Sequence, residues 1–286
     1  MGDFDRTTED TGNVVSLDHL NVTIVDQWAA TLFYMAGLGL TRDPSMMVSV
    51  DNMWLNAGHQ QFHVPTRPDA QVVRGHVGIV VPDMDQLMGR LEEIKPRLEG
   101  TKFDYTQADG YLDVTCPWGN HFHCTGPVAG FKATFGIPYV EFNVPPGTAP
   151  GIAHFYDVIL RARTTVVQGA GQPAAVVQAG TDQSMVFREA PDEGRGYDGH
   201  HLAVYLADFS GPHADLGARG LVTEESNEHQ YRFNNIVDLD TGEVLYELEH
   251  EVRSLRHPMY QRVLVNRDPS VTMGNYTRAA EYLNVG

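Results

Sequence analysis

The 286-residue sequence has little cysteine and no long apolar run. Its two cysteines, Cys116 and Cys124, cannot build a disulfide framework, and their spacing matches no zinc motif. No stretch approaches the ~18 apolar residues that a transmembrane helix needs. The acidic start also lacks the apolar core of a signal peptide. We therefore expect a cytoplasmic protein that does not associate with membranes.

Positive charge is also scarce. The chain has 20 Lys and Arg against 37 Asp and Glu, which gives a formal net charge of −17. Proteins that bind nucleic acid neutralise phosphates with clustered Lys and Arg, so we expect no nucleic-acid partner. Histidine, by contrast, is plentiful, with 13 residues. Where these histidines fall is more informative than their number.

Hydrophobic patterning predicts a recurring order of elements. Residues 16–25 alternate apolar and polar side chains, as in a half-buried strand. Asp26 suits a helix N-cap, and residues 28–39 carry apolar side chains at helical spacing. The same order returns with a strand at 74–81 and a helix that starts at Asp83. Each unit therefore consists of a strand, a helix and three further strands.

The second half repeats this plan at a nearly constant offset. Phe155 follows Phe33 by 122 residues, and His201 follows His76 by 125. A constant offset over several elements indicates duplication. The sequence therefore predicts four similar units in an α+β fold, with a glycine-rich linker at 125–136 between the halves.

We expect consecutive units to pair into domains. The expected boundaries are a flexible N-terminus at 1–15, a first paired domain at 16–126, a second at 137–250 and a C-terminal extension at 251–286. The extension is locally basic in an acidic protein. It is interpreted either as a lid or dimer contact, which would make the protein a homodimer, or as a surface tail.

Histidines occupy equivalent strand positions in the first half. His19 and His76 lie on first strands, whereas His63 and His123 end last strands. Because strand side chains alternate, all four could face one cavity of a paired sheet. A lone strand histidine is usually structural, but four at equivalent positions indicate a divalent metal site, since imidazole nitrogens bind such ions at about 2.0–2.2 Å.

The second half carries a different set at these positions. Glu141 replaces His19, and His201 matches His76. On the last strand, Glu247 and Glu249 share a face. This set predicts a second, carboxylate-rich metal site. Alternatively, the glutamates form salt bridges at a domain interface.

These motifs resemble the vicinal oxygen chelate superfamily, which includes glyoxalase I, extradiol catechol dioxygenases, fosfomycin-resistance enzymes and bleomycin-binding proteins. The resemblance covers about residues 16–250. It rests on strand 18–22, the Phe-Tyr helices, residues 76–79 with Pro82-Asp83, and the turn at 117–120. It implies βαβββ units paired into two half-open, eight-stranded barrel domains, with metal ligands on first and last strands.

The resemblance also implies which positions bind the metal. The dioxygenase triad falls on His19, His76 and His123 in the first half, where His-His-Glu is usual. Glyoxalase-like members use a fourth ligand, here His63 or Gln61. In neither half does the expected set match a known triad.

We therefore predict a metal-dependent enzyme that acts on a small, oxygen-rich substrate. The leading hypothesis is an extradiol-type ring-cleaving dioxygenase that uses iron(II), with zinc or manganese as other metals. The alternatives are a glyoxalase-type isomerase or lyase and a non-catalytic, small-molecule-binding resistance protein. The sequence assigns no catalytic acid or base.

Overall fold

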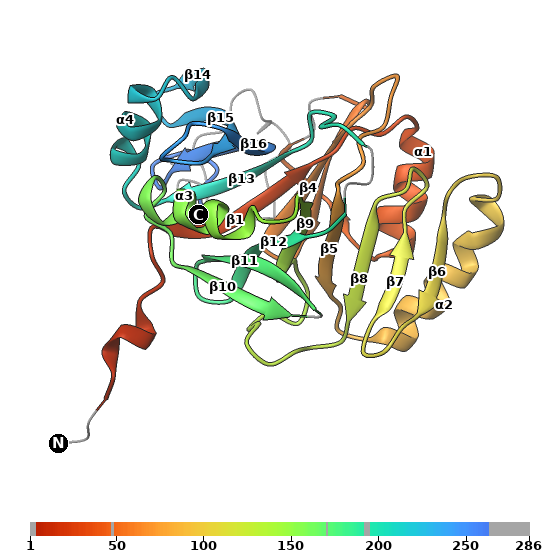
Figure 1. The fold of residues 1–286 in the computed structure, drawn as a ribbon. Helices are drawn as coiled ribbons and strands as arrows, with labels where there is room; N and C mark the ends of the chain where they lie inside the picture. Colours follow the sequence, from red (N-terminus) through yellow and green to blue (C-terminus); the bar gives the residue numbers. More distant parts are fainter. Residues whose placement is uncertain (1–3, 47–48, 170, 192–194, 263–286) are drawn as a thin grey trace, which may run out of the picture.

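The computed structural model describes residues 4–46, 49–169, 171–191 and 195–262. Its strands form two eight-stranded sheets, accompanied by few helices (Figure 1). This confirms the α+β class and the prediction of two half-open, eight-stranded layers built from four βαβββ units. None of the described helices is long and apolar enough to span a membrane.

The first two units follow the predicted order of elements. A short 3-10 turn, η1 (Arg6–Glu9), precedes them. The first unit consists of β1 (Val14–Asn21), α1 (Gln27–Ala30), the π-helical η2 (Thr31–Gly37), β2 (Thr41–Arg42), β3 (Asn52–Ala57) and β4 (Gln60–Pro65). The second consists of β5 (Gly75–Val80), α2 (Met84–Ile94), the 3-10 turn η3 (Lys95–Arg97), β6 (Asp104–Gln107), β7 (Leu112–Thr115) and β8 (His121–Thr125).

The third and fourth units repeat this order. The third consists of β9 (Tyr139–Val144), α3 (Ala149–Val158), β10 (Thr164–Gly169), β11 (Gln172–Ala179) and β12 (Gln183–Glu189). The fourth consists of β13 (His201–Leu206), α4 (Ser210–Ala218), β14 (Val222–Asn227), β15 (Gln230–Val237) and β16 (Val244–Ser254).

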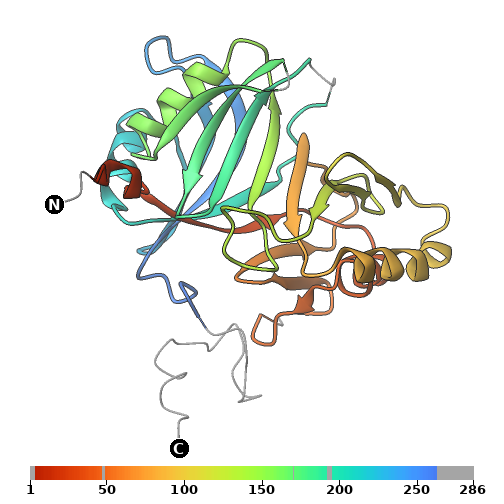
Figure 2. The same cartoon turned by 90° about the horizontal axis from the view of Figure 1, so that it is seen from below.

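The units pair across the two halves of the chain. The first sheet has the order β14-β15-β16-β13-β1-β4-β3-β2, and the second has the order β10-β11-β12-β9-β5-β8-β7-β6. The first unit thus joins the fourth through antiparallel β1 and β13, and the second joins the third through β5 and β9 (Figures 1 and 2). The expected pairing of consecutive units within 16–126 and within 137–250 is therefore wrong.

Packing explains why neighbouring units in the sequence seemed to be partners. Within the first half, Phe122 of β8 packs against Phe33 of η2 and Phe62 of β4, with ring centroids 5.3 and 5.8 Å apart. Within the second half, Phe155 of α3 contacts Phe233 of β15 at 5.9 Å. The repeated aromatic helices therefore build a core inside each half, while backbone hydrogen bonds complete each sheet between the halves.

A β-bulge interrupts the central strand of the first sheet. Leu17 pairs with Val204 and His19 pairs with Ala203, so Asp18 is an extra residue on β1. Such a bulge lets two successive side chains lie on one side of a strand. Asp18 and His19 consequently reach each other, which strict alternation does not permit.

Both expected terminal segments are shorter than predicted. Strand β1 begins at Val14, and Arg163 Nη1 donates to the carbonyl oxygens of Thr7 and Asp10. At the other end, β16 continues to Ser254, past the expected domain boundary at residue 250. Most of the expected C-terminal extension, from residue 263 onward, lies outside the described residues.

The pairing across the halves predicts how the chain behaves when it is cut in the linker. Fragments 1–130 and 131–286 each leave two central strands with an open edge, and open edges promote association. We expect each fragment alone to dimerise or aggregate, and an equimolar mixture to form a 1:1 complex. Size-exclusion chromatography with light scattering measures this. A stable, monomeric fragment 1–130 would contradict the observed strand order.

Candidate metal centre

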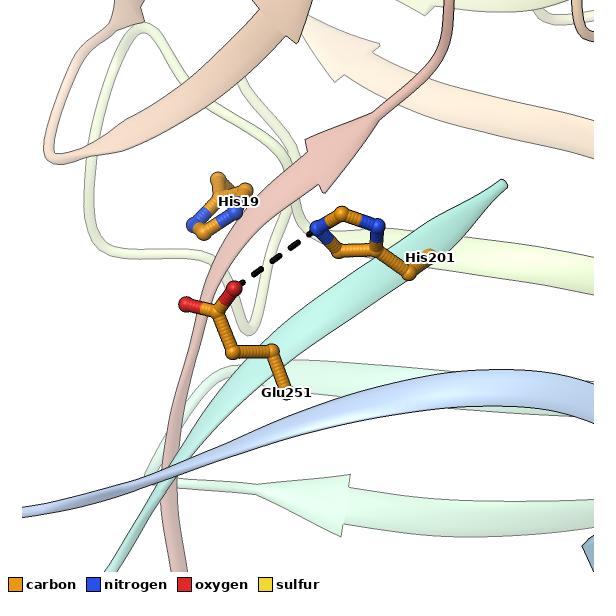
Figure 3. Close-up of side chains that lie close together, drawn as sticks. All are labelled: His19, His201 and Glu251. Carbon is orange, nitrogen blue, oxygen red and sulfur yellow. Dashed lines mark ion pairs between the residues drawn. The ribbon is translucent and has the colours of Figure 1, made fainter. Parts of the chain in front are cut away.

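Three side chains converge at the centre of the first sheet. His19 projects from β1, His201 from β13 and Glu251 from β16, and Figure 3 shows both rings and the carboxylate turned toward one another. One ligand atom from each residue lies within 4.8 Å of those of the other two. All three side chains are buried, with relative exposures of 1%, 8% and 3%. Among the residues that the structure describes, this is the one group of metal-ligating side chains that converges in this way.

Asp18 orients the first histidine. Its Oδ2 atom accepts a hydrogen bond from His19 Nδ1 at 2.9 Å. Burial opposes ionisation of Asp18, but the bond to His19 and the nearby Arg253 outweigh it and lower the pKa of this carboxyl group. Because Nδ1 keeps its proton and donates it to the carboxylate as a hydrogen bond, the lone pair of a neutral His19 lies on Nε2, which is buried without a hydrogen-bond partner.

The second histidine has a similar arrangement. His201 Nδ1 lies 3.2 Å from Glu249 Oε1, and its Nε2 lies 3.7 Å from Glu251 Oε2, as the dashed line in Figure 3 marks. Burial, together with the neighbouring His19, lowers the pKa of His201 well below its usual value. The ring is therefore neutral near pH 7 and presents a lone pair, as a metal ligand must.

Two arginines keep the triad carboxylate charged. Burial alone would raise the pKa of Glu251, but Arg253, His19 and Arg232 together hold it well below the usual range. Arg253 Nη2 lies 2.5 Å from Oε1, and Arg232 Nη2 lies 2.5 Å from Oε2. Glu251 therefore remains an anion that suits a cation at the centre.

A cavity of about 630 Å³ reaches Asp18, the residue that holds His19. Ser16, Gln61 and Tyr205 line it from the sheet, and residues 259–262 also line it. Arg262 of this segment forms a buried ion pair with Asp43. The volume falls in the range of small-molecule sites.

His63, a predicted ligand, lies near His19 without joining the triad. Its ring centroid lies 6.3 Å from that of His19. The His63 ring stacks on the ring of Trp54, with centroids 4.0 Å apart. Its Nε2 is hydrogen-bonded to Asn52 Oδ1. Gln61, the alternative at this strand, donates to Asp43 at 2.8 Å and to Asn56 at 2.6 Å.

The other two predicted first-half ligands lie on the second sheet. His76 and His123 stack on each other with ring centroids 3.6 Å apart, and Tyr111 stacks on His123 at 4.1 Å. Burial, followed by the neighbouring His123, lowers the pKa of His76 to about 3. The predicted cluster of His19, His63, His76 and His123 is therefore divided between two sheets.

The predicted second set is divided in the same way. Glu141 lies on the second sheet, where Arg188 Nε and Nη2 bind its two oxygens at 2.7 and 2.9 Å. Glu247 is exposed. Glu249 stays beside His201 but also pairs with Arg232. The alternative interpretation, that the glutamates form salt bridges, describes Glu141 and Glu249.

Sequence reasoning missed Glu251, the triad carboxylate. The alternation of Glu247 and Glu249 along β16 continues to Glu251, but the expected repeat ended at residue 250. Only the register decides among the three glutamates. His201 pairs with Glu249, whereas Ala203 pairs with both Glu251 and His19, so Glu251 lies level with His19.

Comparison with solved structures identifies the fold. Glyoxalase I from Zea mays superposes with a TM-score of 0.58 at 14% identity, covering 88% of this chain and 95% of that enzyme. A provisionally assigned dioxygenase from Bacillus subtilis superposes with a TM-score of 0.57 at 14% identity, covering 87% and 88%. No family model and no curated protein matches the sequence. The fold that the sequence resemblance implied is thus confirmed by structure alone.

His63 makes stability depend on pH in the metal-free protein. Burial, followed by the charge of His19, lowers its pKa from 6.5 to about 3. The unfolded chain therefore binds a proton that the folded chain rejects between these values. The contribution of His63 to the free energy of unfolding is fully present above about pH 6.5. It falls as the pH is lowered toward 3, by up to about 1.4 kcal/mol per pH unit.

We expect His63→Gln to make the free energy of unfolding less dependent on pH, by the equivalent of up to one bound proton. Urea unfolding at pH 7, 6 and 5 measures this dependence. His59→Gln, the same change at an exposed histidine four residues earlier, serves as the control. An unchanged slope in His63→Gln would show that His63 does not titrate as its burial requires.

Proposed function

We propose that this protein is a metal-dependent enzyme that acts on a small substrate with two neighbouring oxygens, and that it is an extradiol-type ring-cleaving dioxygenase. The observation that carries the proposal is the ligand set of His19, His201 and Glu251. Two imidazoles and one carboxylate with open positions are typical of non-haem iron(II) oxygenases.

The donor atoms fit a divalent ion. His19 Nε2 is a buried nitrogen without a partner, and a metal would satisfy it. The 3.7 Å between His201 Nε2 and Glu251 Oε2 is close to the roughly 3 Å that separates ligand atoms around a bound ion. Asp18 and Glu249 hold the opposite nitrogens of the two rings, as carboxylates commonly do behind metal-binding histidines.

Among the described residues no fourth side chain joins the three ligands, and this favours oxygenase chemistry over isomerase chemistry. His63 is engaged by Asn52, and the amide of Gln61 is engaged by Asp43. A centre with three protein ligands leaves room for two substrate oxygens and a second reactant. The glyoxalase-type alternative, for which a fourth protein ligand was expected, has less support from these contacts.

A bound divalent ion would act as a Lewis acid toward the substrate oxygens, and iron(II) would also activate dioxygen. In ring cleavage one carbon–carbon bond beside the diol breaks, and both atoms of dioxygen enter the product. No external reductant is therefore needed. The chain itself contributes the orientation of the ligands and two buried imidazoles, those of His19 and His201. The cavity is lined by Asp18, which holds His19, and by none of the three ligands themselves.

One experiment separates the three candidate functions. Protein purified without oxygen or chelator is analysed for metal and then tested for oxygen uptake with catechols. We expect about one iron or manganese per chain and uptake of one dioxygen per catechol. Zinc or nickel without oxygen uptake would favour an isomerase or lyase. If no metal binds, even after reconstitution, the remaining candidate is the non-catalytic, small-molecule-binding protein.

Substitutions of the ligands test the location of the centre. We expect His19→Ala, His201→Ala and Glu251→Ala each to abolish stoichiometric metal binding, because each removes one of three ligands. His76→Ala and His123→Ala are matched controls on the second sheet and should retain it. Metal content after gel filtration measures both groups. Loss of metal in the controls alone would move the centre to the second sheet.

Asp18→Asn tests the support behind the ligand. An amide oxygen accepts a hydrogen bond from Nδ1–H more weakly than a carboxylate does, so the tautomer of His19 is no longer fixed. We expect metal affinity to fall about 10–100-fold, measured by competition with a chromophoric chelator. Asp113→Asn, beside His121 on the second sheet, is the control. Equal affinities of Asp18→Asn and the wild type would exclude this role.

A further inference from the structure

Glu251 is held by two arginines that bind different oxygens from different strands. Arg253, on β16 itself, lies at Oε1, and Arg232, on β15, lies at Oε2. The two oxygens are not equivalent. Oε2 is the one that approaches His201 Nε2, at 3.7 Å, and it accepts a hydrogen bond from Arg232, so it lies on the His201 side of the triad. Oε1 is buried beside Arg253 without a hydrogen bond.

Arg253 contacts two carboxylates of the site, those of Asp18 and Glu251. Its side chain is 7% exposed, and its Nη1 donates to Asp18 Oδ2 at 2.9 Å while Nη2 holds Glu251. Its Nε donates to Gln230 at 3.2 Å. One buried guanidinium therefore ties the carboxylate that orients His19 to the carboxylate of the triad.

Arg232 occupies a different place. Its side chain is 20% exposed and spans two glutamates of β16, with Nη1 on Glu249 and Nη2 on Glu251 Oε2. Its Nε also lies 3.6 Å from Glu224 Oε2. If Nη2 left Glu251, the guanidinium would still be paired through Glu249 and Glu224. Its release therefore requires little movement and leaves no bare charge.

We propose that Arg232 is an exchangeable cation that occupies the metal-facing oxygen of Glu251 until a divalent ion displaces it. Arg253, in contrast, is a positioning residue that remains in place when the metal binds. The inference rests on the proposed metal centre. It assigns opposite effects on metal affinity to two arginines that bind the same carboxylate.

The expected signs follow from charge and geometry. Arg232 competes for a ligand oxygen and repels an arriving cation, so its removal should strengthen metal binding. Arg253 also repels the cation, but it fixes Asp18 and Glu251 together. Loss of this brace frees both carboxylates and should weaken metal binding, as loss of supporting contacts behind ligands generally does.

The test is a cobalt(II) titration of the metal-free full chain, followed by the absorbance of the bound ion and by competition with a chelator. We expect Arg232→Met to bind about tenfold or more tightly than the wild type, and Arg253→Met to bind about tenfold or more weakly. Arg232→Lys retains the charge but cannot span both glutamates, and it should fall between the wild type and Arg232→Met. This variant keeps the test usable if the methionine substitution prevents folding.

Arg188→Met is the matched control, because Arg188 also binds a glutamate with two nitrogens but on the second sheet. Its affinity should equal that of the wild type. Weaker or unchanged binding in both Arg232 variants, with a wild type that binds cobalt, would overturn the exchange. A wild type without bound cobalt, with His19→Ala behaving identically, would instead refute the metal centre itself.

Discussion

The candidate centre depends on the antiparallel pairing of β1 with β13. This contact joins strands about 190 residues apart in sequence and places Ala203 opposite His19 and His201 opposite Asn21. Because β16 lies parallel to β13, the same register brings Glu251 level with His19. A shift of one residue would turn the ligands away from the shared face, so the metal site and the strand register are specified together.

The second sheet shows what happens when similar residues meet in another register. There His76 lies directly opposite Glu141, and Arg188 binds both oxygens of that glutamate. In the first sheet the two histidines are diagonal neighbours, which leaves space between their rings. The central strands of the second sheet thus also bring two histidines, His76 and His123, beside one glutamate, Glu141, but among the described residues the ligand atoms converge only on the first sheet.

The first-sheet site also contains a network of ion pairs. Three carboxylates, those of Asp18, Glu249 and Glu251, face two guanidiniums, those of Arg232 and Arg253. Such buried charges are costly unless they are paired, and here every one has a partner. The carboxylates outnumber the guanidiniums, since Arg232 also lies beside Glu224, and this excess of negative charge is suited to a cation. The ion pairs determine which oxygens are available to bind it.

The sequence by itself determined the units, their order and the face on which ligands lie, because hydrophobic period and residue offset depend only on local order. His19 and His201 were predicted as ligands in this way, at two separate sites. Tertiary structure alone decided that the first unit pairs with the fourth, that a bulge brings Asp18 beside His19, and that Glu251 rather than Glu247 completes the triad. These choices depend on hydrogen bonds between distant strands, and duplicated units offer each strand several partners with the same local pattern.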